Sequence, residues 1–423
     1  MTAVRRVLLL STTTGYQLRS FGESAERLGV ELMLATDRCH HLDDPWRDGA
    51  VPVRFHDDDA SLRAILETAE RRPIAGVIAV GDRPTVLAAR VSEALRLPGN
   101  PVEAADATRS KKMMRRRFDT ARLRTPWYFH MRADADASKV AAQVTFPCVV
   151  KPLGLSASRG VIRADTPQQF EYAVRRVRAL LARPEVRAQR TGLTDEILVE
   201  GYIEGREYAI EGLLTAGRLR VLAIFDKPDL MDGPFFEETI YVTPPLLSDE
   251  VQRAVEGEVQ RAVNALGLVH GPIHAECRIG PNGITMLEVA ARPIGGLCSK
   301  VLRFDTDAGP VALEQLLLRH ALGEDVSQLA RESGAAAVMM IPIPTRGLFK
   351  GVRGETAARD VGYIEDVRIT AKRDQLLEPL PEGDSYLGFI FARGPEPRTV
   401  VAALREAHRQ LAFDVDPEIR VAR

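Results

Sequence analysis

The chain has 423 residues, a length that predicts about three domains rather than a single core. Its 57 lysines and arginines nearly balance its 58 acidic residues, which argues against a protein that binds nucleic acid or a membrane surface as a whole. The longest apolar runs, such as residues 335–343, are far shorter than the roughly 20 residues of a membrane span.

Residues 5–105 alternate apolar runs of strand length with helical stretches. The strand-like runs are residues 7–10, 31–35 and 76–80, and the helical stretches are residues 18–28, 62–69 and 85–95. This alternation is typical of an open, mainly parallel α/β sheet. The first strand ends in Ser11-Thr-Thr-Thr-Gly15, which lacks the spacing of a dinucleotide-binding motif, so we do not expect a nicotinamide cofactor.

The four cysteines, at positions 39, 148, 277 and 298, include no C-x-x-C pair. A disulfide framework is unexpected in a chain of this size, so we expect reduced, buried thiols and a cytoplasmic protein. Cys39-His40-His41 looks like a small metal cluster, but adjacent residues of one loop do not readily surround a tetrahedral ion. We therefore assign no metal to it.

Residues 106–124 predict one basic helix, whose charges either face solvent or contact phosphate. Further on, an apolar strand ends in Lys151, which needs a partner because burying an unpaired ammonium is costly. The next segment, residues 153–161, is rich in small residues. Such loops expose N–H groups and can cradle phosphates, although a tight hairpin also uses glycine and serine.

Residues 196–212 predict two strands separated by a glycine-containing turn, with Glu200 and Glu207 at its two ends. Carboxylates only accept hydrogen bonds, so this pair suits the amino group of a base and the hydroxyls of a ribose. The alternative is a hairpin with acidic tips, which is the more common arrangement.

Two short strands, residues 274–279 and 284–289, flank a Pro-Asn-Gly turn and predict a β-hairpin. Pairing symmetric about Asn282 places Glu276 directly opposite Glu288. Opposed carboxylates cost stability unless a cation neutralises them, and Mg²⁺ takes one or two carboxylates together with phosphate oxygens. The alternative leaves both glutamates on the solvated face of an edge hairpin.

Strand geometry also places His274, Glu276 and Arg278 on one face of this hairpin, opposite a clean apolar face. Arg292, followed by Pro-Ile-Gly-Gly, adds a fixed cation beside a backbone that permits close approach. Both features suit an anionic ligand better than a bare surface.

In their order along the chain, these motifs resemble the ATP-grasp superfamily over about residues 100–305. The matching positions are Lys111 in KKMMR, Lys151 in VVKP, the loop with Ser156, Ser158 and Gly160, the hinge Glu200-Gly-Tyr-Ile203 with Glu207, and Glu276 with Glu288. Residues 225–245 and the portion beyond about residue 335 are most similar to the branch of L-amino-acid ligases that form dipeptides.

The resemblance implies an ATP-grasp fold that combines α/β and α+β parts. We expect an N-terminal open α/β (pre-ATP-grasp) domain over residues 1–105 and a nucleotide-binding and catalytic domain over residues 106–305. Residues 306–423 contain strand-like runs and a helix at 399–411, and we expect them to form a C-terminal α+β cap.

The resemblance also implies roles for individual residues. Lys111 and Lys151 would hold the ATP phosphates, with Lys112 as an alternative to Lys111, and the loop with Ser156, Ser158 and Gly160 would close over them. Glu200 and the backbone at Ile203 would meet adenine, Glu207 the ribose, and Glu276 with Glu288 would bind Mg²⁺ or Mn²⁺. Arg292 would stabilise an acyl phosphate, with Lys151 as the second catalytic residue. Many relatives have asparagine where this chain has Ala290, which leaves one or two metal ions open.

The implied activity is ATP-dependent joining of a small-molecule carboxylate to an amine, an amino acid, through an acyl phosphate, with ADP and phosphate as products. We expect Lys227, Glu237 and Arg278 to contact substrate, although each is equally compatible with a surface ion pair. By analogy with the fold, the protein would be a homodimer. The alternatives are a bicarbonate-activating carboxylase of the biotin carboxylase or carbamoyl-phosphate type, and an ATP-binding regulatory protein without turnover.

Overall fold

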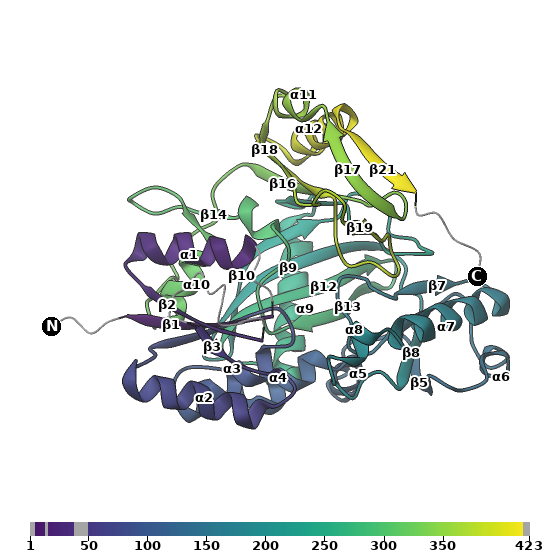
Figure 1. The fold of residues 1–423 in the computed structure, drawn as a ribbon, viewed down its shortest axis with the longest axis horizontal. Helices are drawn as coiled ribbons and strands as arrows, with labels where there is room; N and C mark the ends of the chain where they lie inside the picture. The colour runs from purple at the N-terminus through teal and green to yellow at the C-terminus, as the bar shows by residue number, and fades with distance from the viewer. Residues whose placement is uncertain (1–4, 13–15, 38–49, 418–423) are drawn as a thin grey trace.

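The computed structural model describes residues 5–12, 16–37 and 50–417; the Cys39-His40-His41 sequence lies outside these residues. Figure 1 shows the N-terminal sheet on the left and a small sheet with its helix α7 at the lower right. A central sheet of eight strands lies between them, and the C-terminal elements lie at the top. Within the described ranges, no helix has both the length and the apolar character needed to cross a bilayer.

The N-terminal sheet has the order β3-β2-β1-β4, and all of its pairings are parallel. Side chains of β1 alternate between two cores, with Leu9 packed toward α1 and Leu10 toward α2 and α3. The predicted open α/β sheet is confirmed. The elements are β1 (Arg6–Ser11), α1 (Tyr16–Leu28), β2 (Glu31–Thr36), β3 (Ala50–Pro52), α2 (Asp58–Arg71), β4 (Gly76–Val80) and α3 (Thr85–Ala94).

The predicted basic helix over residues 106–124 is wrong, because the segment forms two helices, α4 (Val102–Arg109) and α5 (Lys111–Thr120). Ser110 separates them in an extended conformation, and its hydroxyl accepts the N–H of Met113 at 3.3 Å. Serine favours this capping position over a helix interior. Lys111 is consequently the first residue of α5.

The small sheet has the antiparallel order β5-β8-β6-β7 and packs against α7 through residues such as Phe170 and Val177. Residues 153–161 connect its strands β6 and β7. The elements are β5 (Tyr128–Arg132), α6 (Ala137–Ala141), β6 (Cys148–Pro152), β7 (Ile162–Ala164), α7 (Pro167–Leu181), α8 (Pro184–Arg187) and β8 (Glu196–Gly201).

The central sheet has the order β13-β12-β9-β10-β11-β16-β20-β18. Because β8 belongs to the small sheet and β9 to the central sheet, residues 196–212 do not form a hairpin but connect two sheets. Helix α9 covers the apolar face that Ala275 and Cys277 present. The elements are β9 (Arg206–Thr215), β10 (Arg218–Asp226), β11 (Ile240–Thr243), α9 (Asp249–Leu266), β12 (Gly271–Gly280) and β13 (Gly283–Ala290).

The C-terminal part contributes β16, β20 and β18 to the central sheet, so the predicted boundary at residue 306 does not coincide with a break in that sheet. A three-stranded sheet, β19-β17-β21, lies beyond it. The elements are η1 (Cys298–Val301), β14 (Arg303–Phe304), β15 (Val311–Ala312), α10 (Leu313–Ala321), β16 (Ala335–Ile341), β17 (Gly347–Arg353), α11 (Glu355–Arg359), β18 (Ile364–Ile369), β19 (Leu376–Leu377), β20 (Gly388–Gly394), α12 (Pro397–Gln410) and β21 (Ala412–Pro417).

The hairpin of β12 and β13 sets Glu276 opposite Glu288, which confirms the predicted pairing. Its turn is shorter than expected, because Gly280 pairs with Gly283 and only residues 281–282 form the loop. The register next to the turn is therefore shifted by one residue from the predicted one.

A β-bulge restores the predicted pairing. The register from the turn runs as far as Cys277 opposite Met286, and without interruption it would set Glu276 opposite Leu287. Leu287 instead stands as the extra residue of the bulge, and its carbonyl accepts a hydrogen bond from Arg115 at 2.9 Å. The bulge thus aligns the two carboxylates and fixes an arginine at the same place.

Candidate active site

A cavity of about 660 Å³ has walls from the N-terminal, small and central sheets. The carboxyl ends of the neighbouring strands β1 and β4 face it, as is usual for ligand sites on open α/β sheets. Most of the predicted site residues line it: Lys111, Lys151, Ser156, Ser158, Glu200, Ile203, Glu207, Glu276, Arg278, Glu288 and Arg292. Gly160, Lys227 and Glu237 are not among its lining residues.

Glu200, near the end of β8, is buried between two cations. Lys151 at the end of β6 donates to its Oε1, and Arg115 of α5 donates to both carboxylate oxygens, at 3.0 and 3.3 Å. Burial alone would raise the pKa of Glu200, but Arg115 and Lys151 outweigh it and lower the pKa to about 2. Lys151 thus has the partner that its buried position requires.

The two adjacent lysines at the start of α5 point to different places. Lys111 lines the cavity and donates to the carbonyl of Leu155 at 2.8 Å. Lys112 instead pairs with Glu196 at 2.7 Å, with more than a third of each side chain exposed. Of the two, only Lys111 is positioned beside the small-residue loop and the cavity.

The loop between β6 and β7 contains two non-glycine residues with left-handed backbone, Ala157 at φ 56° and Ser158 at φ 54°. Each such residue costs on the order of 1–3 kcal/mol, so surrounding contacts must hold the loop in place. Gly160 follows at φ 75°, and a Cβ there would lie 2.9 Å from Leu180 and 3.0 Å from Pro152. This position therefore requires glycine.

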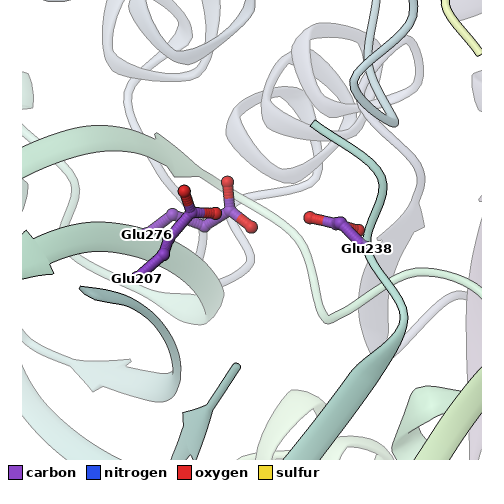
Figure 2. Close-up of side chains that lie close together, drawn as sticks. All are labelled: Glu207, Glu238 and Glu276. Carbon is purple, nitrogen blue, oxygen red and sulfur yellow. The ribbon is translucent and has the colours of Figure 1, made fainter. Parts of the chain in front are cut away.

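Lys227 forms the centre of a second buried cluster. Its ammonium lies 2.7 Å from Glu207, 2.9 Å from Glu238 and 2.7 Å from Glu276, and 4.8 Å from the ring centre of Tyr241. Figure 2 shows the three carboxylates, which come from two neighbouring strands and from the segment facing them. Burial would lower the pKa of Lys227, but the three carboxylates raise it well above its ordinary value. Lys227 is thus a fixed cation beneath the cavity.

Arg278 connects the hinge to the central sheet. It donates to Glu207 at 3.0 Å, to the carbonyl of Ile203 at 2.8 Å and to the carbonyl of Met231 at 2.6 Å. Its guanidinium also lies 5.2 Å from the ring centre of Tyr202. These contacts already use the carbonyl of Ile203 and one oxygen of Glu207.

A histidine and a glutamate beside Glu276 were missed by the sequence analysis as site residues. Glu211 accepts a hydrogen bond from Nδ1 of His274 through one oxygen and the N–H of Ile294, at 3.0 Å, through the other. Burial would lower the pKa of His274, but Glu211 outweighs it and raises the pKa to about 9. The signal was available, because the period of two on β9 puts Glu211 on the same face as Glu207.

Asp82, directly after β4, was also missed. It accepts from Nε of Arg292 at 2.7 Å and lines the cavity. Burial opposes ionisation of Asp82, but Arg292 lowers its pKa, and Asp82 in turn raises the pKa of Arg292. No sequence signal links two residues so far apart along the chain, although Asp82 does follow a strand of a parallel sheet, where ligand-facing residues are expected.

Glu276 and Glu288 offer oxygens suited to a hard cation such as Mg²⁺. Lys227, Tyr241 and His274 all approach Oε1 of Glu276, and within the described part of the chain no hydrogen bond reaches its Oε2. Glu288 faces the cavity and makes no ion pair with any described residue. The donor set therefore fits a divalent cation that bridges the hairpin.

Glu237 is half buried, and burial raises its pKa, but the neighbouring Glu238 is the residue that reaches the cavity and Lys227. The substrate contact predicted for Glu237 stays a prediction. Cys148, Cys277 and Cys298 are buried and carry no disulfide, as expected, whereas Cys39 lies outside the described residues.

Three family models match the chain. The ATP-grasp domain model matches residues 144–301, the ATP-grasp N-terminal domain model residues 22–99, and the L-amino acid ligase C-terminal domain 2 model residues 339–416. The crystal structure of an L-amino acid ligase from Bacillus licheniformis superposes with a TM-score of 0.82 at 27% identity, covering 98% of this chain and 100% of that one. The chain belongs to the ATP-grasp superfamily.

Other proteins are similar over different lengths. An alanine–anticapsin ligase of Bacillus subtilis is 27% identical over 290 residues, which are 64% of this chain and 60% of that protein. An uncharacterized protein of Sinorhizobium fredii is 23% identical over 98% of this chain and 84% of its own length. Phosphoribosylglycinamide synthetase from Anaerococcus prevotii, with a TM-score of 0.67 over 97% of this chain and all of its own, is 16% identical and shares the fold.

These comparisons confirm the predicted superfamily and fold, and the C-terminal match confirms the resemblance to L-amino-acid ligases. This ATP-grasp chain is an ATP-dependent ligase of that general type.

Proposed function

We propose that the protein activates a small-molecule carboxylate as an acyl phosphate and joins it to the amine of an amino acid, with release of ADP and phosphate. One observation carries this proposal: the opposed Glu276 and Glu288 line the same cavity as Lys111, Lys151 and Arg292. Metal-binding carboxylates, phosphate-binding lysines and a buried arginine are what transfer of a phosphoryl group to a carboxylate requires.

ATP would bind between the small and central sheets. Lys111, Lys151 and the loop with Ser156, Ser158 and Gly160 would hold the phosphates. Because Glu200 already accepts hydrogen bonds from Arg115 and Lys151, the adenine amino group would donate to a remaining lone pair of that carboxylate. The carbonyl of Ile203 is engaged by Arg278, so its N–H is the group left for the base.

Glu276 and Glu288 would hold Mg²⁺ or Mn²⁺, which when bound neutralises charge on the phosphate oxygens. The ammonium of Lys227 contacts Glu207, Glu238 and Glu276 together, so it would hold these carboxylates in place. We assign Lys227 this positioning role in addition to its predicted substrate contact.

The reaction balances in two steps. An oxygen of the substrate carboxylate attacks the γ-phosphorus, and the bond to the ADP oxygen breaks. The unprotonated amine then attacks the acyl carbon, phosphate leaves with the bonding pair, and the nitrogen releases a proton. Arg292, held by Asp82, would stabilise the negative charge that develops on the acyl oxygen.

The test is ADP and phosphate release from Mg²⁺-ATP across a panel of single amino acids and pairs, with bicarbonate as a separate addition and Glu288→Ala as control. Turnover that needs two amino acids and is absent in the control supports the ligase. Turnover that needs bicarbonate would favour the carboxylase alternative. ATP binding without turnover under any condition would favour the regulatory one.

A further inference from the structure

An acidic turn from the C-terminal part of the chain lies against the loop between β6 and β7. It comprises residues 378–384, between β19 and β20, and includes Glu378, Glu382 and Asp384. The turn is tight, because a Cβ on Gly383 would lie 1.8 Å from the carbonyl oxygen of Glu378. A shape fixed in this way presents its carboxylates and carbonyls in a set arrangement.

The acidic turn contacts the loop through two hydrogen bonds and one ion pair. The N–H of Gly160 donates to the carbonyl of Pro381 at 2.8 Å, and Nε of Arg159 donates to the carbonyl of Glu382 at 2.8 Å. Arg159 also approaches Asp384 at 3.5 Å. These contacts follow directly after the two left-handed residues of the loop.

Two further ion pairs connect the acidic turn to the helices beside the loop. Arg183, which follows α7, holds Glu378 with two hydrogen bonds of 2.6 and 2.9 Å. Arg176 of α7 donates to Glu382 at 2.7 Å. All four side chains are about a quarter exposed, so these pairs are partly shielded from solvent.

We propose that the acidic turn is a positioning element that holds the loop over residues 156–160 in its nucleotide-binding conformation. The inference rests on the proposed function for the role of the loop in binding phosphate. The loop stores backbone strain at Ala157 and Ser158, and the turn supplies the contacts that offset it. By thermodynamic reciprocity, bound ATP strengthens the attachment of the turn to the loop as much as the turn strengthens ATP binding.

Cleavage by trypsin tests this contact without any assay of activity. The peptide bond between Arg159 and Gly160 lies in the loop, and the N–H of Gly160 donates to the carbonyl of Pro381. In Glu382→Gln, we expect cleavage at this bond, measured by mass spectrometry of the 1–159 fragment, to rise about fivefold, the limit for a partly exposed ion pair. We expect the KM for ATP to rise by a similar factor while kcat and the amine KM stay within about twofold. Mg²⁺-ATP should slow cleavage of the unaltered protein.

The matched control is Glu406→Gln, which makes the same charge change on α12, where the hydrogen bonds of Glu406 with described residues stay within its own helix. The exchanged pair Arg176→Glu/Glu382→Arg should restore slow cleavage and the original KM, which a general loss of structure would not do. Equal cleavage and KM in Glu382→Gln and Glu406→Gln would overturn the proposal. Faster cleavage in a protein that never binds ATP would overturn the proposed function and the nucleotide role of the turn, but not the contact itself.

Discussion

Two buried charge clusters border the cavity, and they are built with opposite stoichiometry. In the first, one carboxylate, Glu200, lies between the cations Lys151 and Arg115. In the second, the ammonium of Lys227 lies at the centre of three carboxylates, with Arg278 on the outer oxygen of Glu207. His274 lies 3.7 Å from Glu276. The first cluster and Lys227 are almost fully shielded from water, whereas Glu238 and Glu276 of the second cluster keep 18% and 14% of their side chains exposed. Water therefore screens these charges only weakly.

The difference shows how one cavity accommodates ligands of both signs. The excess positive charge around Glu200 suits phosphate oxygens, and the excess negative charge around Lys227 suits a divalent cation. A buried ion pair adds little stability by itself, but a missing partner is costly. Each cluster therefore has a central residue of the minority sign, Glu200 in one and Lys227 in the other, which stabilises the excess charge around it.

The largest expected effect comes from removing the minority charge of the acidic cluster. Lys227→Met leaves three carboxylates facing one another, and we expect the free energy of unfolding in urea at neutral pH to fall by about 3–5 kcal/mol. Lys139→Met, at an exposed helix position, is the matched control and should change stability by less than about 0.5 kcal/mol. A Lys227→Met protein as stable as the control would show that the carboxylates do not depend on this lysine.

The next largest effect is expected from altering Glu288, the second carboxylate of the proposed metal site. We expect Glu288→Gln to lower kcat/KM by about 10²–10³-fold, because the amide keeps the shape of the side chain but removes its charge. Mn²⁺ binding in the presence of ATP, measured by electron paramagnetic resonance, should weaken in parallel. Unchanged Mn²⁺ binding would move the metal site to the cluster around Lys227.

Substitutions of the two neighbouring lysines of α5 test the positively charged part of the cavity around Glu200. We expect Lys111→Met to raise the KM for ATP about ten- to a hundredfold, since a charge-assisted contact to phosphate is lost. Lys112→Met, the adjacent residue with an exposed ion pair, should stay within about threefold of the unaltered protein. The reverse result would assign the phosphate contact to Lys112.

The smallest effect is the pH dependence that Glu200 brings to stability. Its pKa of about 2 in the folded protein lies below the ordinary value of 4.5, so its contribution to stability is complete above pH 4.5 and is lost as the pH falls toward 2. Between pH 6 and pH 3.5 this loss is about 1 kcal/mol. Urea unfolding should measure the stability of the unaltered protein and of Glu200→Gln at pH 6 and at pH 3.5. The difference between the two proteins should be smaller at pH 3.5 by that amount. A difference that stays constant with pH would contradict the low pKa of Glu200.

The opposed pair of glutamates could be predicted because its residues are local in sequence, whereas the roles of the other site residues were expected only from the resemblance to the ATP-grasp superfamily. The hairpin pairing of Glu276 with Glu288 follows from two strand-like runs and one turn, although the predicted turn was too long and the bulge at Leu287 compensated for it. The bulge has no clear sequence signal, since its stabilising partner Arg115 is distant along the chain.

Other features depend on tertiary structure. The helix break at Ser110 was missed because serine is tolerated within helical patterns, and only the cap geometry identifies it. The partners of Glu200 and Glu207 were not predicted, because β8 and β9 enter different sheets. Sequence alone does not reveal which of the adjacent Glu237 and Glu238 faces the cavity, and in the structure Glu238 does so.

The ion pair between Asp82 and Arg292 has a consequence for how such a chain can be recombined. A chimera that exchanges the N-terminal sheet for that of another protein replaces Asp82 as well, even if every predicted site residue is kept. We therefore expect grafted hybrids to retain function only when the donor sheet carries a carboxylate directly after its fourth strand. In this sense the N-terminal sheet is a part of the candidate active site and not an interchangeable support.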